Sequence, residues 1–154
     1  MLSITEENVL INADVDSGGG IISLLTGLLV QNGCVKAEYA GAVITREEQY
    51  PTGIPASGLP VAIPHAFADD CVLKPCVAAA TLGRPVMFRN MFDPDEELAV
   101  VMVFLIALSS KDKNRAAKDL EEVMSIFSNG ELLCGLYAAK SAGEFVRILG
   151  KREG

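Results

Sequence analysis

The chain has 154 residues, of which 50% are hydrophobic, and this length favours one domain with a full apolar core. Its 13 lysines and arginines stand against 20 aspartates and glutamates, which gives a formal net charge of -7. Nucleic acids and anionic membranes bind basic patches, so this acidic chain is a poor candidate for either partner.

Residues 98–108 form the longest apolar run, which is far below the roughly 18–20 residues of a membrane-spanning helix. The N-terminus has neither the basic nor the apolar region of a signal peptide, so we expect a cytoplasmic protein. The cysteines form no C-x-x-C pair and are expected to be free thiols; they are Cys34, Cys71, Cys76 and Cys134. A zinc site made from His65, Cys71 and Cys76 is a weaker alternative, because that spacing matches no common ligand pattern.

The first elements follow from turns and apolar spacing. Residues 8–11 are predicted to form a short strand. A glycine-rich turn then offers Asp16 or Ser17 as the N-cap of a helix. The apolar face of that helix includes Ile21, Leu25 and Leu29, and Asn32-Gly33 should end it. A second helix is predicted over residues 35–50, with Arg46 and Glu47 in its last turn. Residues 51–58 form a loop of proline, glycine and hydroxyl residues.

Residues 59–63 read as an apolar strand that Pro64 stops, because proline has no N–H to donate. His65 is then expected to be the first residue beyond a strand end, a common place for site residues in α/β folds. Residues 77–82 and 85–88 are predicted to pair as a hairpin around Gly83-Arg84. Residues 93–97 are expected to be a solvated acidic turn. Residues 98–108 are expected to form a central strand covered on both faces.

The remainder of the chain is predicted to be helical. A helix begins near residues 109–112 and ends at Asn129-Gly130, and a short helix follows over residues 131–138. Ser141 and Glu144 form a capping-box pattern before the last helix. These patterns predict a single α/β domain over residues 1–154, with a mixed sheet flanked by helices on both faces.

His65 is the only histidine, and a cation, a hydroxyl and a glycine turn come shortly before it. A neutral imidazole is a good nucleophile towards phosphorus, and an unperturbed histidine with a pKa near about 6.5 is mostly neutral at pH 7. The charge on a phosphoryl group needs a cation and N–H or O–H donors, for which Arg46, Thr52 and the backbone at Gly53 are candidates. The alternative is a strand-end histidine without any role.

Two blocks, R-E-x-x-x-P-T-G-I at residues 46–54 and V-A-I-P-H at residues 61–65, resemble the signature of one family. It comprises the enzyme IIA domains of the fructose–mannitol superfamily, in the bacterial phosphoenolpyruvate-dependent sugar phosphotransferase system. The resemblance implies that His65 accepts a phosphoryl group from HPr and donates it to a cysteine of enzyme IIB. Enzyme IIB then phosphorylates sugar bound by the membrane subunit IIC. The resemblance also implies that Arg46 supports the phosphoryl group, and that no cofactor is needed.

Many members of this family carry a second histidine in the helix after the central strand. Residues 113–117 contain none here, so this partner of the phosphoryl group is either missing or replaced by Asn114 or Arg115. In this respect, and in both blocks, the chain resembles the galactitol-type branch, although the sugar is chosen mainly by the IIB and IIC subunits. The same resemblance leaves a regulatory module of the nitrogen type as the alternative function. Because two proteins must reach His65 in turn, it is expected to be exposed in a shallow apolar depression.

Overall fold

The structure, a computed structural model, describes residues 4–151. Its strands and helices follow in this order: η1 (Glu6–Asn8), β1 (Val9–Ala13), α1 (Gly18–Gln31), α2 (Tyr39–Gln49), β2 (Gly53–Ile54), η2 (Ala56–Gly58), β3 (Val61–Ala62), β4 (His65–Phe67), β5 (Cys76–Asn90), β6 (Asp93–Leu108), α3 (Lys113–Phe127), α4 (Gly130–Ala138) and α5 (Ala142–Lys151). Among these described residues, no helix combines the length and apolar character that a membrane crossing requires.

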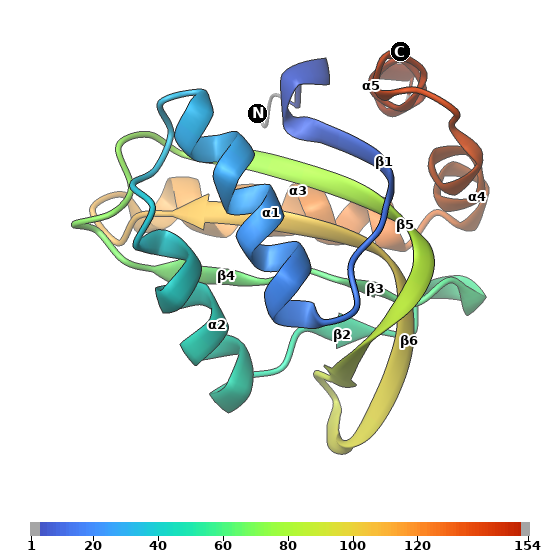
Figure 1. The fold of residues 1–154 in the computed structure, drawn as a ribbon, viewed down its shortest axis with the longest axis horizontal. Helices are drawn as coiled ribbons and strands as arrows, with labels where there is room; N and C mark the ends of the chain where they lie inside the picture. Colours follow the sequence, from blue (N-terminus) through green and yellow to red (C-terminus); the bar gives the residue numbers. More distant parts are fainter. Residues whose placement is uncertain (1–3, 152–154) are drawn as a thin grey trace.

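Six strands form one mixed sheet in the order β1-β5-β2-β3-β6-β4, and β5 and β6 also pair directly. The β5–β6 pair is antiparallel, whereas β1 runs parallel to β5 and both β3 and β4 run parallel to β6. Figure 1 shows β5 and β6 as the long, curved centre, with α1 and α2 in front of the sheet and α3 behind it. This is the predicted single-domain α/β fold with a mixed sheet flanked by helices on both faces.

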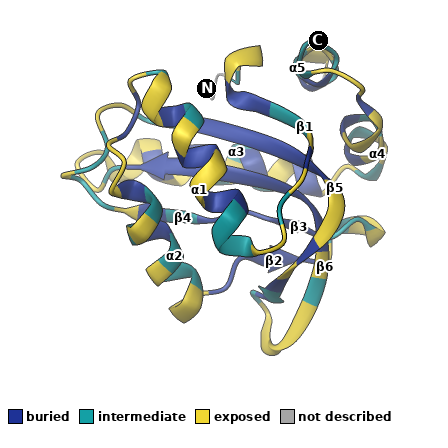
Figure 2. Cartoon of the chain, in the orientation of Figure 1, coloured by how far each residue is buried: buried dark blue, intermediate teal, exposed yellow. Residues whose placement is uncertain are grey.

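Alternating side chains of the two long strands feed two separate cores. Along β5, Ala78 and Ala80 belong to the cluster with α1 and α2, whereas Val77 and Ala79 belong to the cluster with α3, α4 and α5. Along the predicted strand at residues 98–108, every residue from 100 onward is buried (Figure 2). A strand that is apolar on both sides can satisfy this arrangement only with a helical layer on each face.

The predicted caps are present. The Ser17 side chain accepts the N–H of Gly20 at the start of α1, and Ser141 accepts that of Glu144 at the start of α5. Gly33 has a φ of 72°, the left-handed backbone that was predicted to end the first helix. The local signals of these residues were therefore sufficient to place both helix starts.

The predicted start of the second helix is wrong. Helix α2 begins at Tyr39, because Val35 instead forms an antiparallel bridge with Val72. The Lys36 N–H also donates to the Cys71 carbonyl at 2.8 Å, which holds this segment in an extended form. Residues 35–38 have helical spacing, but the backbone of this segment pairs with residues 71–72, which are distant in sequence.

The predicted hairpin and acidic turn are also wrong. Strand β5 continues through Gly83-Arg84, and its register shifts between Thr81 and Val86, where Pro85 lies. An irregularity of this kind is where a sheet tolerates proline. The acidic residues 93–97 are exposed as predicted, but they begin β6, and the turn lies at residues 91–92.

The prediction of four free thiols is wrong for two of them. Cys34 and Cys76 form a disulfide across 42 residues of sequence, whereas Cys71 and Cys134 are free. A disulfided Cys76 cannot act as a zinc ligand, so the alternative site with His65 and Cys71 is not formed. Within residues 4–151, no group of three or more potential metal ligands comes together.

Candidate functional site

His65 does not lie beyond a strand end, as was expected, but begins the short edge strand β4. Strands β3 and β4 follow each other along β6, and residues Ile63 and Pro64 form the gap between them. Pro64 cannot donate to the ladder, although its carbonyl still accepts the N–H of Ile106 at 3.1 Å. The gap leaves the Ile63 carbonyl available to the histidine ring.

The Nδ1 atom of His65 lies 2.7 Å from the carbonyl oxygen of Ile63. A carbonyl only accepts hydrogen bonds, so in the neutral ring Nδ1 carries the proton and Nε2 carries the lone pair. Burial lowers the pKa of His65, the hydrogen bond to Ile63 opposes this effect, and the charge of Arg46 lowers it further. The side chain is partly buried rather than fully exposed as expected. The result is a neutral imidazole with a free lone pair on Nε2.

Arg46 lies in the last turn of α2, as predicted, and its guanidinium is held between two aromatic rings. Its Cζ atom is 4.9 Å from the ring centroid of Tyr50 and 5.5 Å from that of Phe67. The Phe67 ring also meets the His65 ring edge to face, with centroids 6.1 Å apart. Phe67 therefore brings the predicted arginine and the predicted histidine into one cluster.

The Nε atom of Arg46 is buried, and none of the residues 4–151 accepts a hydrogen bond from it. A buried donor without a partner is costly, and such groups gather at functional sites. An anionic oxygen arriving beside His65 would satisfy this donor and the cation together. The orphaned Nε is thus the structural observation that points to an anion here.

Tyr39 joins the helix of Arg46 to the strand of His65, and the sequence patterns did not reveal this role. Its hydroxyl accepts the Ala66 N–H at 3.0 Å and lies 2.9 Å from the Ala66 carbonyl oxygen and 2.8 Å from that of Ile106. Burial raises the pKa of Tyr39 to about 12, so the hydroxyl keeps its proton. One fixed hydroxyl therefore couples α2 to β4 and β6.

Thr52 is buried, and its polar groups are turned towards Glu47. Its backbone N–H donates to Oε2 of Glu47 at 2.8 Å, and its hydroxyl donates to Oε1 at 2.7 Å. Burial raises the pKa of Glu47 to about 7 against the lowering effect of these two hydrogen bonds. A phosphate-binding role for Thr52 stays a prediction, and it requires the hydroxyl to leave Glu47.

Gly53 lies in β2 between two neighbouring strands. It pairs with Ala62 of β3 and with Asn90 of β5, and its carbonyl accepts the N–H of Met91 at 2.8 Å. A Cβ atom here would lie 2.6 Å from the carbonyl oxygen of Arg89, so only glycine fits. Its role at a phosphate stays a prediction. Its observed role is to bring the loop after Arg46 next to the histidine strand.

The α3 side of the site contains residues that sequence reasoning missed. A groove of about 370 Å³ runs from Phe67 along α3, with Lys113, Ala117 and Leu120 in its wall. Phe67 could have been found from strand alternation, since it follows His65 by two residues and lies on the same face. Arg115, one expected substitute for the second histidine, instead pairs with Asp119 at 3.5 Å and lines a different hollow.

A mixed sheet with a helical layer on each face, and a neutral imidazole beside a guanidinium that packs against two aromatic rings, define the class of this molecule. The chain belongs to the EIIA 2 family of the phosphoenolpyruvate-dependent sugar phosphotransferase system, whose model matches residues 2–152. Phosphoryl transfer is the general activity that this family implies.

One relative is the mannitol-specific EIICBA component of Buchnera aphidicola subsp. Baizongia pistaciae (strain Bp), 22% identical over 154 residues. The match covers 99% of this chain and 22% of that protein, so the chain spans about a fifth of the relative.

Two solved structures share the fold. The chain is similar to IIA mannitol from Escherichia coli, with a TM-score of 0.76 and 23% identity over 96% of this chain and 99% of that one. It is equally similar to nitrogen regulatory protein IIA-Ntr from Neisseria meningitidis, with a TM-score of 0.76 and 22% identity over 93% of each chain.

Proposed function

We propose that this chain is a phosphohistidine carrier of a sugar phosphotransferase system, with Nε2 of His65 as the acceptor atom. The observation that carries the proposal is the Nδ1 contact to Ile63, which leaves the Nε2 lone pair free, beside an arginine whose Nε lacks a partner. Nε2 attacks the phosphorus of phosphohistidine on HPr, an N–P bond forms on His65, and the N–P bond to HPr breaks. The freed imidazole of HPr leaves with the bonding pair.

In the second step, the thiolate of an enzyme IIB cysteine attacks the same phosphorus and releases His65 in its neutral form. A structural neighbour supports this choice of partner. It is the Escherichia coli complex of enzyme IIAMTL with phosphorylated enzyme IIBMTL, at a TM-score of 0.77, 23% identity, and coverage of 99% of this chain and 100% of that one. The groove beside Phe67 is almost wholly apolar and adjoins the acceptor, which suits a small, transient protein contact. We propose that the carrier acts in the cytoplasm. We also propose that the membrane subunit IIC is an indirect partner.

Galactitol is the sugar that we propose for the pathway, on the strength of the two sequence blocks and the missing second histidine. The similar proteins whose names give a sugar are mannitol-type, so the sugar must be tested directly. A regulatory role is the second candidate, and the similarity to the nitrogen regulatory protein of Neisseria meningitidis favours it. Phosphoryl transfer to purified galactitol IIB, mannitol IIB and fructose IIB separates these candidates.

The central experiment incubates the chain with phosphoenolpyruvate, enzyme I and HPr and follows intact mass. We expect one phosphoryl group per chain, labile in acid and stable in base, and no phosphorylation of His65→Gln. The hydrogen bonds of Tyr39 go to backbone groups of Ala66 and Ile106 and do not use the imidazole, so circular dichroism should match the wild type. Phosphorylation that persists in His65→Gln would remove the histidine from the mechanism. Phosphorylation by HPr without transfer to any IIB would favour the regulatory role.

A further inference from the structure

A second hollow, whose lining does not include His65, has a disulfide in its wall. The hollow measures about 370 Å³, and its lining includes both Cys34 and Cys76 together with Lys74, Arg115 and Glu7. The disulfide therefore borders this depression, although Cys34 itself belongs to the buried core. We refer to this depression as the disulfide hollow.

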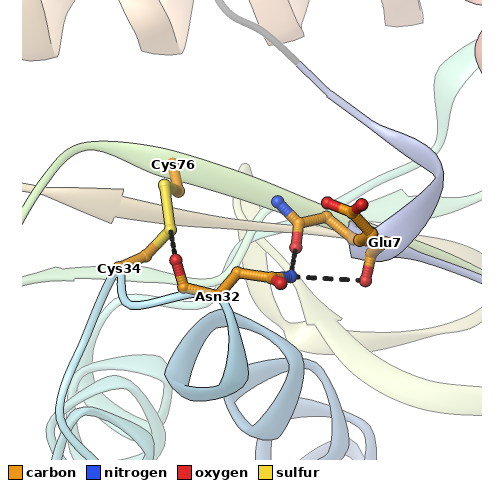
Figure 3. The surroundings of a disulfide bond; sticks show 5 residues. Glu7, Asn32, Cys34 and Cys76 are labelled. Carbon is orange, nitrogen blue, oxygen red and sulfur yellow. Dashed lines mark hydrogen bonds between the residues drawn. A yellow bond between two sulfur atoms is a disulfide. The ribbon is translucent and has the colours of Figure 1, made fainter.

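The two sulfur atoms of this bond are not equivalent. Cys34 is 1% exposed, whereas Cys76 is partly exposed, so an incoming thiolate reaches the sulfur of Cys76 more easily. The Cys34 sulfur lies 3.8 Å from the carbonyl oxygen of Asn32, a contact that Figure 3 marks with a dashed line. A disulfide sulfur has no proton to donate, but a Cys34 thiol would have one. The acceptor for the reduced form is already in place.

We propose that the Cys34–Cys76 bond is a reversible thiol–disulfide exchange site for a small thiol that carries carboxylates. The thiolate attacks the Cys76 sulfur, a mixed disulfide forms there, and the bond to Cys34 breaks. Cys34 leaves as a thiolate and takes a proton from water, and the resulting S–H donates a hydrogen bond to the Asn32 carbonyl oxygen. A second molecule of the same thiol then attacks the mixed disulfide, releases Cys76 as a thiolate that is protonated by water, and leaves as the oxidised dimer.

Local charge selects the kind of thiol. Two cations, Lys74 and Arg115, line the hollow, and the carboxylate in its lining is that of Glu7. Arg115 shares its charge with Asp119 at 3.5 Å, which leaves Lys74 as the main cation for a ligand. A fixed positive charge concentrates anionic reactants and stabilises thiolates. An anionic thiol should therefore react faster than a cationic one.

Opening the Cys34–Cys76 disulfide would weaken the attachment of the segment that leads away from the His65 strand. Residues 68–75 connect β4 to β5, and the Cys34 carbonyl accepts the N–H groups of Leu73 at 2.8 Å and Lys74 at 3.1 Å. The bridge between Val35 and Val72 continues the same attachment. The disulfide therefore ties the start of β5, at Cys76, to Cys34, and the residues at positions 34–35 pair with the segment at positions 72–74. This inference does not depend on the proposed phosphoryl transfer.

The test uses the full oxidised chain and glutathione as the anionic thiol, with cysteamine as the cationic one. We expect glutathione to form a mixed disulfide at Cys76, located by peptide mass after acid quenching, and then to yield two new alkylatable thiols besides Cys71 and Cys134. Amide hydrogen exchange at Leu73 and Lys74 should accelerate after reduction. Cys71→Ser should leave all of this unchanged, which excludes the nearby free thiol as the reactant.

Lys74→Gln should slow the glutathione reaction roughly twofold at low salt and should not slow cysteamine, since one exposed charge acts weakly and is screened. Lys118→Gln, an exposed lysine outside the hollow, is the matched control and should have no effect. Three results would overturn the proposal. These are four alkylatable thiols before any reductant is added, resistance of the bond to glutathione until the chain unfolds, or equal rates for both thiols in wild type and Lys74→Gln.

Discussion

The guanidinium of Arg46 packs on the ring of Phe67, with 5.5 Å between Cζ and the ring centroid, and the same ring touches the imidazole of His65. The aromatic ring orients both groups without neutralising either of them. A carboxylate in its place would pair with the arginine and compete with an incoming phosphoryl group. The arrangement holds an unneutralised cation beside a neutral imidazole.

Replacing Arg46 by alanine should slow phosphoryl transfer from HPr while leaving the fold intact. Loss of one donor to developing negative charge typically costs about 10²–10³ in rate. Arg46→Lys should restore only part of the rate, because an ammonium lacks the planar fork of donors. Rapid-quench intact mass gives these rates. Arg84→Ala is the matched control, since Arg84 forms an exposed ion pair with Asp14, and equal rates for all variants would show that Arg46 is structural.

The single histidine allows its titration to be followed without overlap. Burial and the charge of Arg46 lower the pKa of His65, so its NMR titration should have a midpoint below about 6.5. The transfer rate should then be flat between pH 7 and 8, because the ring is already neutral. Stability linked to this group is present above about pH 6.5 and is lost as the pH falls. A midpoint above that of a free histidine would contradict the neutral-nucleophile assignment.

Glu47 should make the fold less stable as the pH rises. Its pKa is raised from 4.5 to about 7, so the folded chain binds a proton that the unfolded chain has released. By linkage, the contribution of Glu47 to stability is fully present below about pH 4.5 and is lost, by about 3 kcal/mol, as the pH rises through 7. Glu47→Gln should flatten this slope in urea unfolding at pH 5 and pH 8. Glu48→Gln, at an exposed neighbour, should keep it, and identical slopes in all three chains would count against the buried carboxyl.

Gly53→Ala should destabilise the fold by about 1–3 kcal/mol, because the new methyl group would press on the Arg89 carbonyl and force β2 away from β5. Gly27→Ala is the matched control. Gly27 lies within α1 with no atom near a built Cβ, so alanine should stabilise that helix by about 0.5–1 kcal/mol. Chemical denaturation of both variants checks the pair. Equal effects of the two substitutions would show that the close approach at Gly53 is not limiting.

Elements with strong local signals could be predicted, and elements decided by distant partners could not. The buried strand at residues 98–108 was evident because it is apolar on both faces, and Ser17 and Ser141 cap their helices through neighbours three residues away. The true start of α2 depends on Val72, which lies far along the chain from Val35. No residue pattern carries that information.

The candidate site likewise combines features that could be predicted from sequence with features that could not. His65 and Arg46 could be proposed from residue chemistry and motif, and the structure brings them together around Phe67. The pairing of the Thr52 hydroxyl with Glu47 could not be foreseen, because either residue could equally have faced the histidine. The disulfide between Cys34 and Cys76 could not be foreseen either, since cysteine spacing alone does not determine connectivity.

The position of β4 at the rim of the sheet has a consequence for solubility. An exposed edge strand is a template on which another chain can add its own strand and begin to aggregate. Here that strand is only three residues long, Pro64 interrupts the line before it, and the Tyr39 hydroxyl occupies the Ala66 N–H. The edge that carries His65 is thereby a poor seed for intermolecular β-sheet.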